Sequence, residues 1–135
     1  MIETFEIVSK AIADPSRIRI LKVLEKGELC VCQITTVTGL SAPAISKALG
    51  VLKAAGLVQL RREGRWAYYR LADRALNPYA LSFLTIVQNS LLEDPSILED
   101  QRILELVKAV PIQIVCDQGR SGLGALDLDR DVNSQ

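Results

Sequence analysis

Residues 39–71 read GLSAPAISKALGVLKAAGLVQLRREGRWAYYRL, and they predict a turn, a helix and a β-hairpin in direct succession. Gly39 and Leu40 supply the turn, and Ser41 offers an N-capping hydroxyl to a helix over 42–55. Apolar residues recur along this helix at i, i+4 and i+7, so one of its faces is expected to be buried against a core. The residues of this apolar face are Ile45, Leu49 and Leu52.

The segment after this helix changes to the period of a β-strand. Apolar and polar side chains alternate on both sides of Glu63-Gly64, which predicts a β-hairpin over Leu57–Leu71. Two short helices joined by a glycine-containing turn and followed by a hairpin form a winged helix-turn-helix, in which the hairpin is the wing. The expected fold class is therefore mainly α-helical with one β-hairpin wing.

Capping residues and prolines mark the other helices. Three dipeptides place an N-capping side chain before a proline suited to the first helical turn: Asp14-Pro15, Asn77-Pro78 and Asp94-Pro95. With the apolar periodicity, they predict helices near 3–13, 15–26, 29–39, 78–92 and 95–110. Beyond these we expect a strand or packed coil at 112–116, a flexible stretch at 119–124 and disorder at 127–135. The predicted organisation is one domain over 1–110 and a flexible acidic C-terminal tail over 111–135.

The residue inventory excludes several classes of function. The chain has no histidine, which removes histidine metal sites, Ser-His-Asp triads and Cys-His pairs, and no enzymatic activity is expected. No apolar run approaches the ~18 residues of a membrane span, and the acidic N-terminus is unlike that of a signal peptide. Three cysteines without an export signal predict reduced thiols in the cytoplasm.

Charge is segregated along the chain, although 16 basic and 16 acidic residues cancel overall. Residues 41–74 hold seven basic side chains against two acidic ones, residues 75–92 hold no charge, and residues 93–135 are acidic. A basic block that coincides with the helix-turn-helix and the wing predicts binding to double-stranded DNA. The expected contacts are Ser41, Ala42, Ala44, Ser46 and Lys47 from the helix, and Arg61, Arg62 and Arg65 from the wing. The alternative is an ordinary solvated face that keeps the protein soluble.

Three motifs resemble the ArsR/SmtB family of dimeric metalloregulatory repressors. They are ADPSRIRIL at 13–21, the segment from GLS to KAAGLV at 39–58, and RREGRWAYY at 61–69. The resemblance covers roughly residues 5–92 and implies a homodimer held by its first and last helices. Such a dimer binds operator DNA and leaves it when an inducer binds. The uncharged segment 75–92 suits a dimer helix, with an ordinary core helix as the alternative, and Ala48 departs from the histidine that many members carry in the recognition helix.

The segment Glu28-Leu29-Cys30-Val31-Cys32 contains two closely spaced cysteines, which indicate a thiol site. Thiolates are soft ligands that select thiophilic ions, and this segment resembles the arsenic-sensing branch of the family. That branch has a third cysteine three residues after the second, where this chain has Thr35. The alternatives are a pair of small buried hydrophobic residues or a redox switch. Because residues i and i+2 of a regular helix point about 200° apart, we expect an ion held by both sulfurs to unwind this turn.

Cys116 is the third sulfur, and flexibility at 119–124 is expected to let it reach the other two from its own subunit or from a partner. A spare thiol is the alternative, as is a two-thiolate site for a monomethylated arsenical. The favoured hypothesis is a repressor without a permanent cofactor, released by arsenite, antimonite or an organic trivalent arsenical at Cys30, Cys32 and Cys116.

Three rival functions remain open at the level of the sequence. The first is a repressor of the same fold that senses a Cd/Pb-type soft metal or thiol oxidation. The second is a small thiol oxidoreductase, which lacks the usual C-x-x-C spacing and a βαβ context here. The third is a winged-helix interaction module that does not bind DNA.

Overall fold

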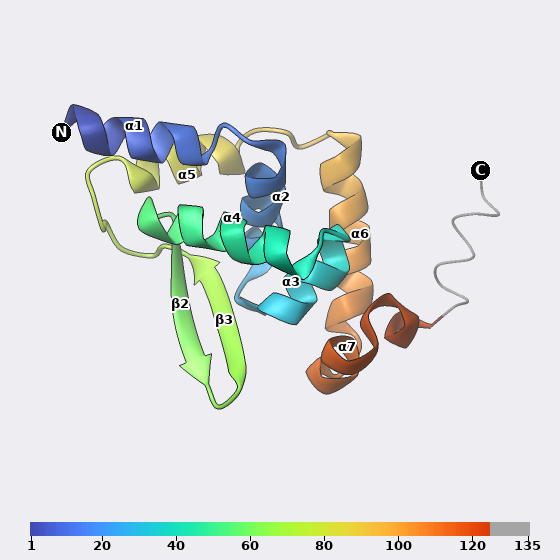
Figure 1. Ribbon diagram of the computed structural model, residues 1–135. Helices are drawn as coiled ribbons and strands as arrows, with labels where there is room; N and C mark the ends of the chain where they lie inside the picture. Colours follow the sequence, from blue (N-terminus) through green and yellow to red (C-terminus); the bar gives the residue numbers. More distant parts are fainter. Residues whose placement is uncertain (125–135) are drawn as a thin grey trace.

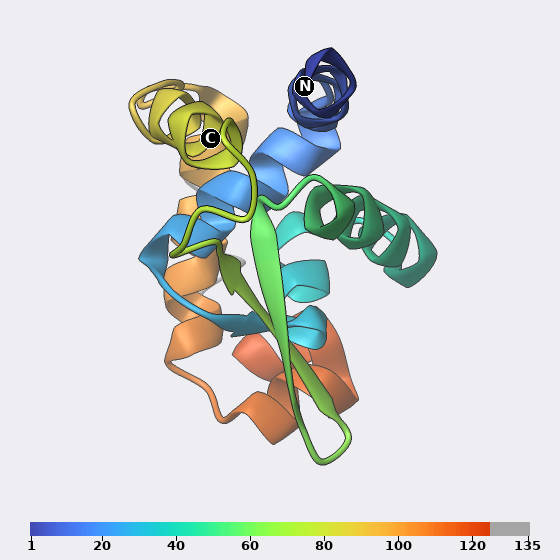
Figure 2. The same cartoon turned by 90° about the vertical axis from the view of Figure 1, so that its left-hand side faces the viewer.

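The computed structural model describes residues 1–124 of the 135-residue chain, and Figures 1 and 2 show it from two sides. The helices are α1 (Ile2–Ala11), α2 (Pro15–Val23), α3 (Val31–Thr38), α4 (Ala42–Ala54), α5 (Ala80–Gln88), α6 (Pro95–Lys108) and α7 (Ile112–Gln118), with 3₁₀ turns η1 (Leu24–Lys26) and η2 (Gly119–Leu123). The strands are β1 (Leu29–Cys30), β2 (Val58–Glu63) and β3 (Trp66–Leu71).

The predicted helix-turn-helix is confirmed by its local geometry. Gly39 ends α3 in the left-handed conformation with φ 72°, which glycine adopts without strain. Ser41 then caps α4, because its side chain accepts a hydrogen bond from the backbone N–H of Ala44. The expected apolar stripe is buried, with Ile45, Leu49 and Leu52 each at most 1% exposed. Helix α4, defined by these signals, runs across the front of the domain in Figure 1.

The predicted hairpin is also present and projects from the helical body as a wing (Figure 1). Strands β2 and β3 pair antiparallel from Val58 opposite Leu71 to Glu63 opposite Trp66. The two turn residues are Gly64 and Arg65, one position later than the alternation around Glu63-Gly64 suggests. Gly64 has φ 57°, and that left-handed conformation lets the strands reverse direction tightly.

The segment before α3 differs from the prediction. The sequence predicts a helix from residue 29, whereas Leu29 and Cys30 form β1 and pair with Tyr69 and Tyr68 of β3. The helix begins at Val31, with Cys30 as its extended N-cap residue. Long-range pairing with the wing therefore overrides the local helical periodicity at these two residues.

The C-terminal part of the described chain also differs from the prediction. Residues 112–118 form α7 instead of a strand or coil, and residues 119–123 form a 3₁₀ turn instead of a flexible stretch. Val115 and Leu123 are buried, so packing onto the body stabilises both short elements. The expectation of disorder at 127–135 lies outside the described residues.

Helices α1 and α5 lie side by side at one end of the domain (Figures 1 and 2). Phe5 of α1 contacts Tyr79 and Phe83 with ring centroids 5.3 and 5.5 Å apart. This end exposes large apolar side chains that the core does not cover, namely Met1, Ile2, Phe5, Ile7, Leu81 and Ile86. Within residues 1–124, no helix is both long and apolar enough to span a lipid bilayer.

Candidate nucleic-acid interface and thiol site

The exposed face of α4, together with its N-cap Ser41, carries all five residues of this region that the sequence predicts as DNA contacts. Ser41, Ala42, Ala44, Ser46 and Lys47 are exposed, and they gather at the N-terminal part of the helix. Small side chains allow close approach to base edges, and the free N–H groups of a helix N-terminus favour phosphate. Ala48 instead lies on the buried face at 7% exposure, so it packs against the core rather than facing outward.

The three wing arginines have different surroundings. Arg61 is engaged by Glu28 at 2.7 Å and by Glu63 at 2.7 Å, and its guanidinium lies over Tyr68. Hydrogen bonding from Arg61 lowers the pKa of the Glu28 carboxyl below its usual value, against a smaller opposing effect of burial. Arg61 therefore fastens the wing to the segment before Cys30, which the sequence did not indicate.

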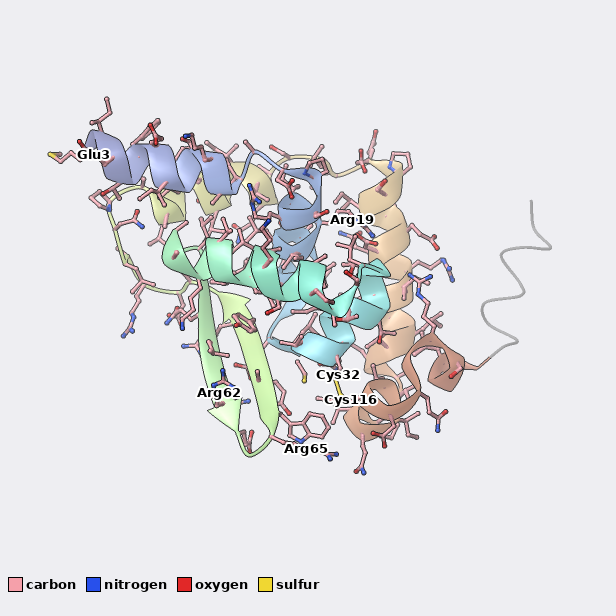
Figure 3. The ribbon with its side chains drawn as sticks, in the orientation of Figure 1. Glu3, Arg19, Cys32, Arg62, Arg65 and Cys116 are labelled. Carbon is pink, nitrogen blue, oxygen red and sulfur yellow. A yellow bond between two sulfur atoms is a disulfide. The ribbon has the colours of Figure 1, made fainter. Side chains whose placement is uncertain are left out.

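Arg62 and Arg65 are more available to a polyanion. Arg62 is exposed and forms no ion pair with any described residue. Arg65 lies at the hairpin tip towards the Cys32–Cys116 pair (Figure 3), with its guanidinium 4.3 Å from the Trp66 ring centroid. Their role in DNA contact stays a prediction.

The three cysteines meet at one place in the subunit. The Sγ atoms of Cys30, Cys32 and Cys116 all lie within 4.8 Å of one another. Cys30 and Cys32 have Sγ atoms 3.4 Å apart, and Cys32 and Cys116 are joined as a disulfide with Cα atoms 5.1 Å apart (Figure 3). The expected unwinding of a turn is not needed, because extended Cys30 precedes the helix and already directs its sulfur towards Cys32. Whether the three residues bind an ion stays a prediction.

Thr35 stands where the resemblance places a third cysteine, and it is engaged elsewhere. Its hydroxyl donates a hydrogen bond of 2.9 Å to the carbonyl oxygen of Val31. The third sulfur of the cluster comes instead from α7 of the same subunit. The sequence predicted that Cys116 reaches the other two cysteines, but not that a helix of seven residues packed on α3 would position it.

Two arginines hold the opposite end of α3, next to the turn before α4. Arg120 donates to the carbonyl oxygens of Thr36 and Val37. Arg19 donates a hydrogen bond to the carbonyl oxygen of Thr38. Its guanidinium also forms a bidentate ion pair with the buried carboxylate of Asp100 in α6, with both N–O distances at 2.8 Å. Sequence patterns gave no signal for either residue, because both act across long distances in the chain.

A cavity of about 540 Å³ adjoins the sulfurs. Its lining joins the thiol cluster to both predicted DNA-contact elements, through Ala42 at the start of α4 and Arg65 at the wing tip. Most of the remaining lining is apolar and includes Val31, Trp66 and Val115. The three cysteines and the predicted DNA-contact elements therefore line the same cavity.

The fold and this site define a winged helix-turn-helix protein with three clustered cysteines beside the elements predicted to contact DNA. Residues 14–59 match the family described as bacterial regulatory protein, arsR family. The chain is 37% identical to a homodimeric winged helix-turn-helix DNA-binding domain from Mycobacterium bovis, a possible ArsR-family transcriptional regulator, with a TM-score of 0.55 over 64% of this chain and 77% of that one. This chain belongs to the ArsR family, which consists of transcriptional regulators rather than enzymes.

The names of two curated relatives refer to different chemical elements, arsenic and cadmium. The arsenic resistance transcriptional regulator ArsR1 of Pseudomonas putida is 48% identical over 66 residues, which cover 48% of this chain and 52% of the relative. The cadmium resistance transcriptional regulatory protein CadC homolog of Staphylococcus aureus is 40% identical over 67 residues, covering 49% of this chain and 55% of the relative. The chain thus spans about half the length of these relatives.

Proposed function

We propose that this chain is a dimeric transcriptional repressor that leaves its operator when trivalent arsenic or antimony binds to Cys30, Cys32 and Cys116. The observation that carries the proposal is the meeting of three sulfurs within 4.8 Å, beside the elements predicted to contact DNA. Soft thiolates suit a thiophilic trivalent ion. The name of the Pseudomonas putida relative supports arsenic as the element that is sensed.

The exposed N-terminal face of α4 and the wing support operator binding. Lys47, Arg62 and Arg65 supply positive charge for phosphates, while the small residues of α4 allow the helix to enter the major groove. The exposed apolar side chains of α1 and α5 support a dimer, because a face with Phe5 and Ile86 exposed to water is unfavourable for a lone subunit. A dimer would present two copies of α4 and the wing to an operator whose half-sites are related by two-fold symmetry.

The position of the thiols supplies a route for release. Cys32 lies in the first turn of α3, and Cys116 lies on α7. An inducer that holds Cys30 together with these two sulfurs fixes β1 and α7 against the helix that positions the turn before α4, whereas the Cys32–Cys116 disulfide leaves Cys30 out. If this state disfavours the DNA-bound arrangement, linkage requires that DNA in turn weakens inducer binding. Binding needs reduced thiols, so the Cys32–Cys116 disulfide must first be opened by a thiol reductant.

A titration of the full chain with DNA from upstream of its own gene tests the proposal. The reduced protein should retard this DNA in a salt-dependent manner, and arsenite should reverse the shift whereas peroxide should not. Retention of the DNA at saturating arsenite would contradict the proposed inducer, and absence of any shift would contradict the repressor.

Thiol oxidation is a second candidate signal, and the Cys32–Cys116 disulfide is the observation that favours it. Oxidation would link α3 to α7 by two of the three sulfurs that an inducer holds. Release by peroxide but not by arsenite in the same titration would identify this alternative. The name of the Staphylococcus aureus relative refers to cadmium. Cadmium is therefore the third compound to add in this titration, after arsenite and peroxide.

A further inference from the structure

We infer that the cavity beside the cysteines receives the organic group of an aryl-substituted trivalent arsenical, with Trp66 as the residue that selects it. This inference rests on the proposed function and specifies the ligand of the same site. Its starting point is the cavity of about 540 Å³ that opens onto all three sulfurs. That volume falls within the range of small-molecule sites in proteins, and it exceeds what a single trivalent ion requires.

The lining of the cavity combines two kinds of chemistry. Cys30, Cys32 and Cys116 supply sulfur, and the remaining lining is mostly apolar, including Val31 and Trp66. A ligand that fits this combination has a thiophilic centre and an apolar group attached directly to it. An arylarsenical has this construction, whereas inorganic arsenite leaves the apolar part of the cavity without a contact.

Two of the cysteines offer sulfurs at a suitable separation. Cys30 and Cys32 have Sγ atoms 3.4 Å apart, which one pyramidal three-coordinate atom can bridge. Condensation of R–As(OH)₂ with two thiols breaks two S–H bonds and two As–OH bonds, forms two As–S bonds and releases two waters. Arsenic stays trivalent throughout. The Cys32–Cys116 disulfide first accepts two electrons and two protons from a thiol reductant, which leaves as its own disulfide.

Trp66 supplies an aromatic surface to the apolar part of the lining. Its ring is half-buried, lines the cavity and carries the Arg65 guanidinium 4.3 Å from its centroid. An aryl group gains offset or edge-to-face contact with an indole, beyond the effect of apolar burial alone. Because Arg65 stacks on this indole at the wing tip, the aryl contact also reaches a predicted DNA-contact residue.

The test compares three ligands by calorimetry on the reduced full chain: phenylarsenite, methylarsenite and arsenite. Wild type should bind phenylarsenite more tightly than methylarsenite, and the emission of Trp66, the chain's only tryptophan, should change more with the phenyl compound. Trp66→Leu should weaken phenylarsenite binding about three- to tenfold and leave the other two ligands unchanged. Trp66→Phe should retain most of the phenyl preference.

Leu98→Ala is the matched control, because it removes an exposed apolar side chain of α6 that does not line the cavity. The inference is overturned if wild type binds methylarsenite as tightly as phenylarsenite, a comparison that needs no variant to fold. It is also overturned if Trp66→Leu weakens all three ligands equally. Release of DNA by arsenite without a phenyl preference would remove this inference alone, whereas failure of every arsenical to bind would remove the proposed inducer class as well.

Discussion

Arg120 donates a hydrogen bond of 3.0 Å from Nε to the carbonyl oxygen of Thr36, a residue 84 positions earlier in the chain. Its Nη2 donates a second bond, to Val37, at 3.2 Å. Cationic side chains are favourable at the C-terminus of a helix, where carbonyl groups lack helical partners. Since Cys116 of the same segment is joined to Cys32, α7 and η2 hold α3 at both ends.

This arrangement predicts that Arg120 transmits the state of Cys116 to the turn before α4. Arg120→Gln should leave inducer affinity within about twofold of wild type, because the three thiols remain. Operator affinity with saturating arsenite should fall less than in wild type, because α7 no longer holds the carbonyl end of α3. Fluorescence anisotropy with labelled operator, with and without inducer, measures the coupling free energy directly.

Lys26→Gln serves as the matched control for Arg120→Gln. It also removes one positive charge, but its side chain is exposed and touches none of the α3 carbonyls. An equal loss of coupling in both variants would show that net charge, rather than the α3 contact, is responsible.

Arg62 and Arg65 should supply phosphate contacts from the wing, whereas Arg61 is occupied by Glu28 and Glu63. The Arg62→Ala/Arg65→Ala double variant should weaken operator binding without disturbing the dimer, and should lower the slope of log affinity against log salt by about 2. Arg61→Ala should change this slope less. Equal slopes for wild type and the double variant would contradict the assignment of the wing.

Elements with local chemical signals were predictable, and elements defined by distant contacts were not. Asp14, Ser41 and Asp94 each cap a helix as expected, because a capping side chain reaches only two or three residues along the chain. Cys30 was expected on a helix, but pairing with Tyr68 of the wing draws it into a strand. Strand pairing across 38 positions leaves no local pattern at residue 30 to distinguish it from a helix start.

The same distinction between local signals and distant contacts applies to the candidate site. The exposed face of α4 follows from the 3.6-residue period of a helix, so the sequence alone predicts which residues lie on it. The three-thiol cluster was expected to need a flexible tail, yet a packed seven-residue helix with buried Val115 positions Cys116. So short a helix lacks stability of its own, and its formation depends on tertiary packing that the sequence does not display.

Asp100 should contribute strongly to folding stability through Arg19. Its side chain is 4% exposed and pairs with the Arg19 guanidinium, which also reaches the Thr38 carbonyl. Asp100→Asn removes one partner of a largely buried ion pair and should lower the free energy of unfolding by about 3 kcal/mol. Urea denaturation at fixed protein concentration measures this loss. Glu99→Gln, on the same helix but in an exposed pair with Arg102, should cost less than about 1 kcal/mol.

Cys30→Ser and Cys32→Ser should each give a folded protein that binds operator but no longer releases it. Neither residue belongs to the exposed face of α4, so DNA affinity without inducer should stay within about twofold of wild type. Circular dichroism and operator anisotropy, before and after arsenite, check the two parts separately. If either variant still releases DNA at wild-type inducer concentrations, this pair is not the sensor.

Cys116→Ser should separate the inducers by the number of sulfurs each requires. Arsenite has three exchangeable oxygens and gains a third thiolate from Cys116, whose sulfur lies within 4.8 Å of the other two. Methylarsenite has only two and is satisfied by Cys30 and Cys32. The substitution should therefore lower arsenite affinity far more than methylarsenite affinity. X-ray absorption of the arsenite complex should count three sulfur neighbours in wild type and two in the variant, and equal affinity losses for both inducers would remove Cys116 from the site.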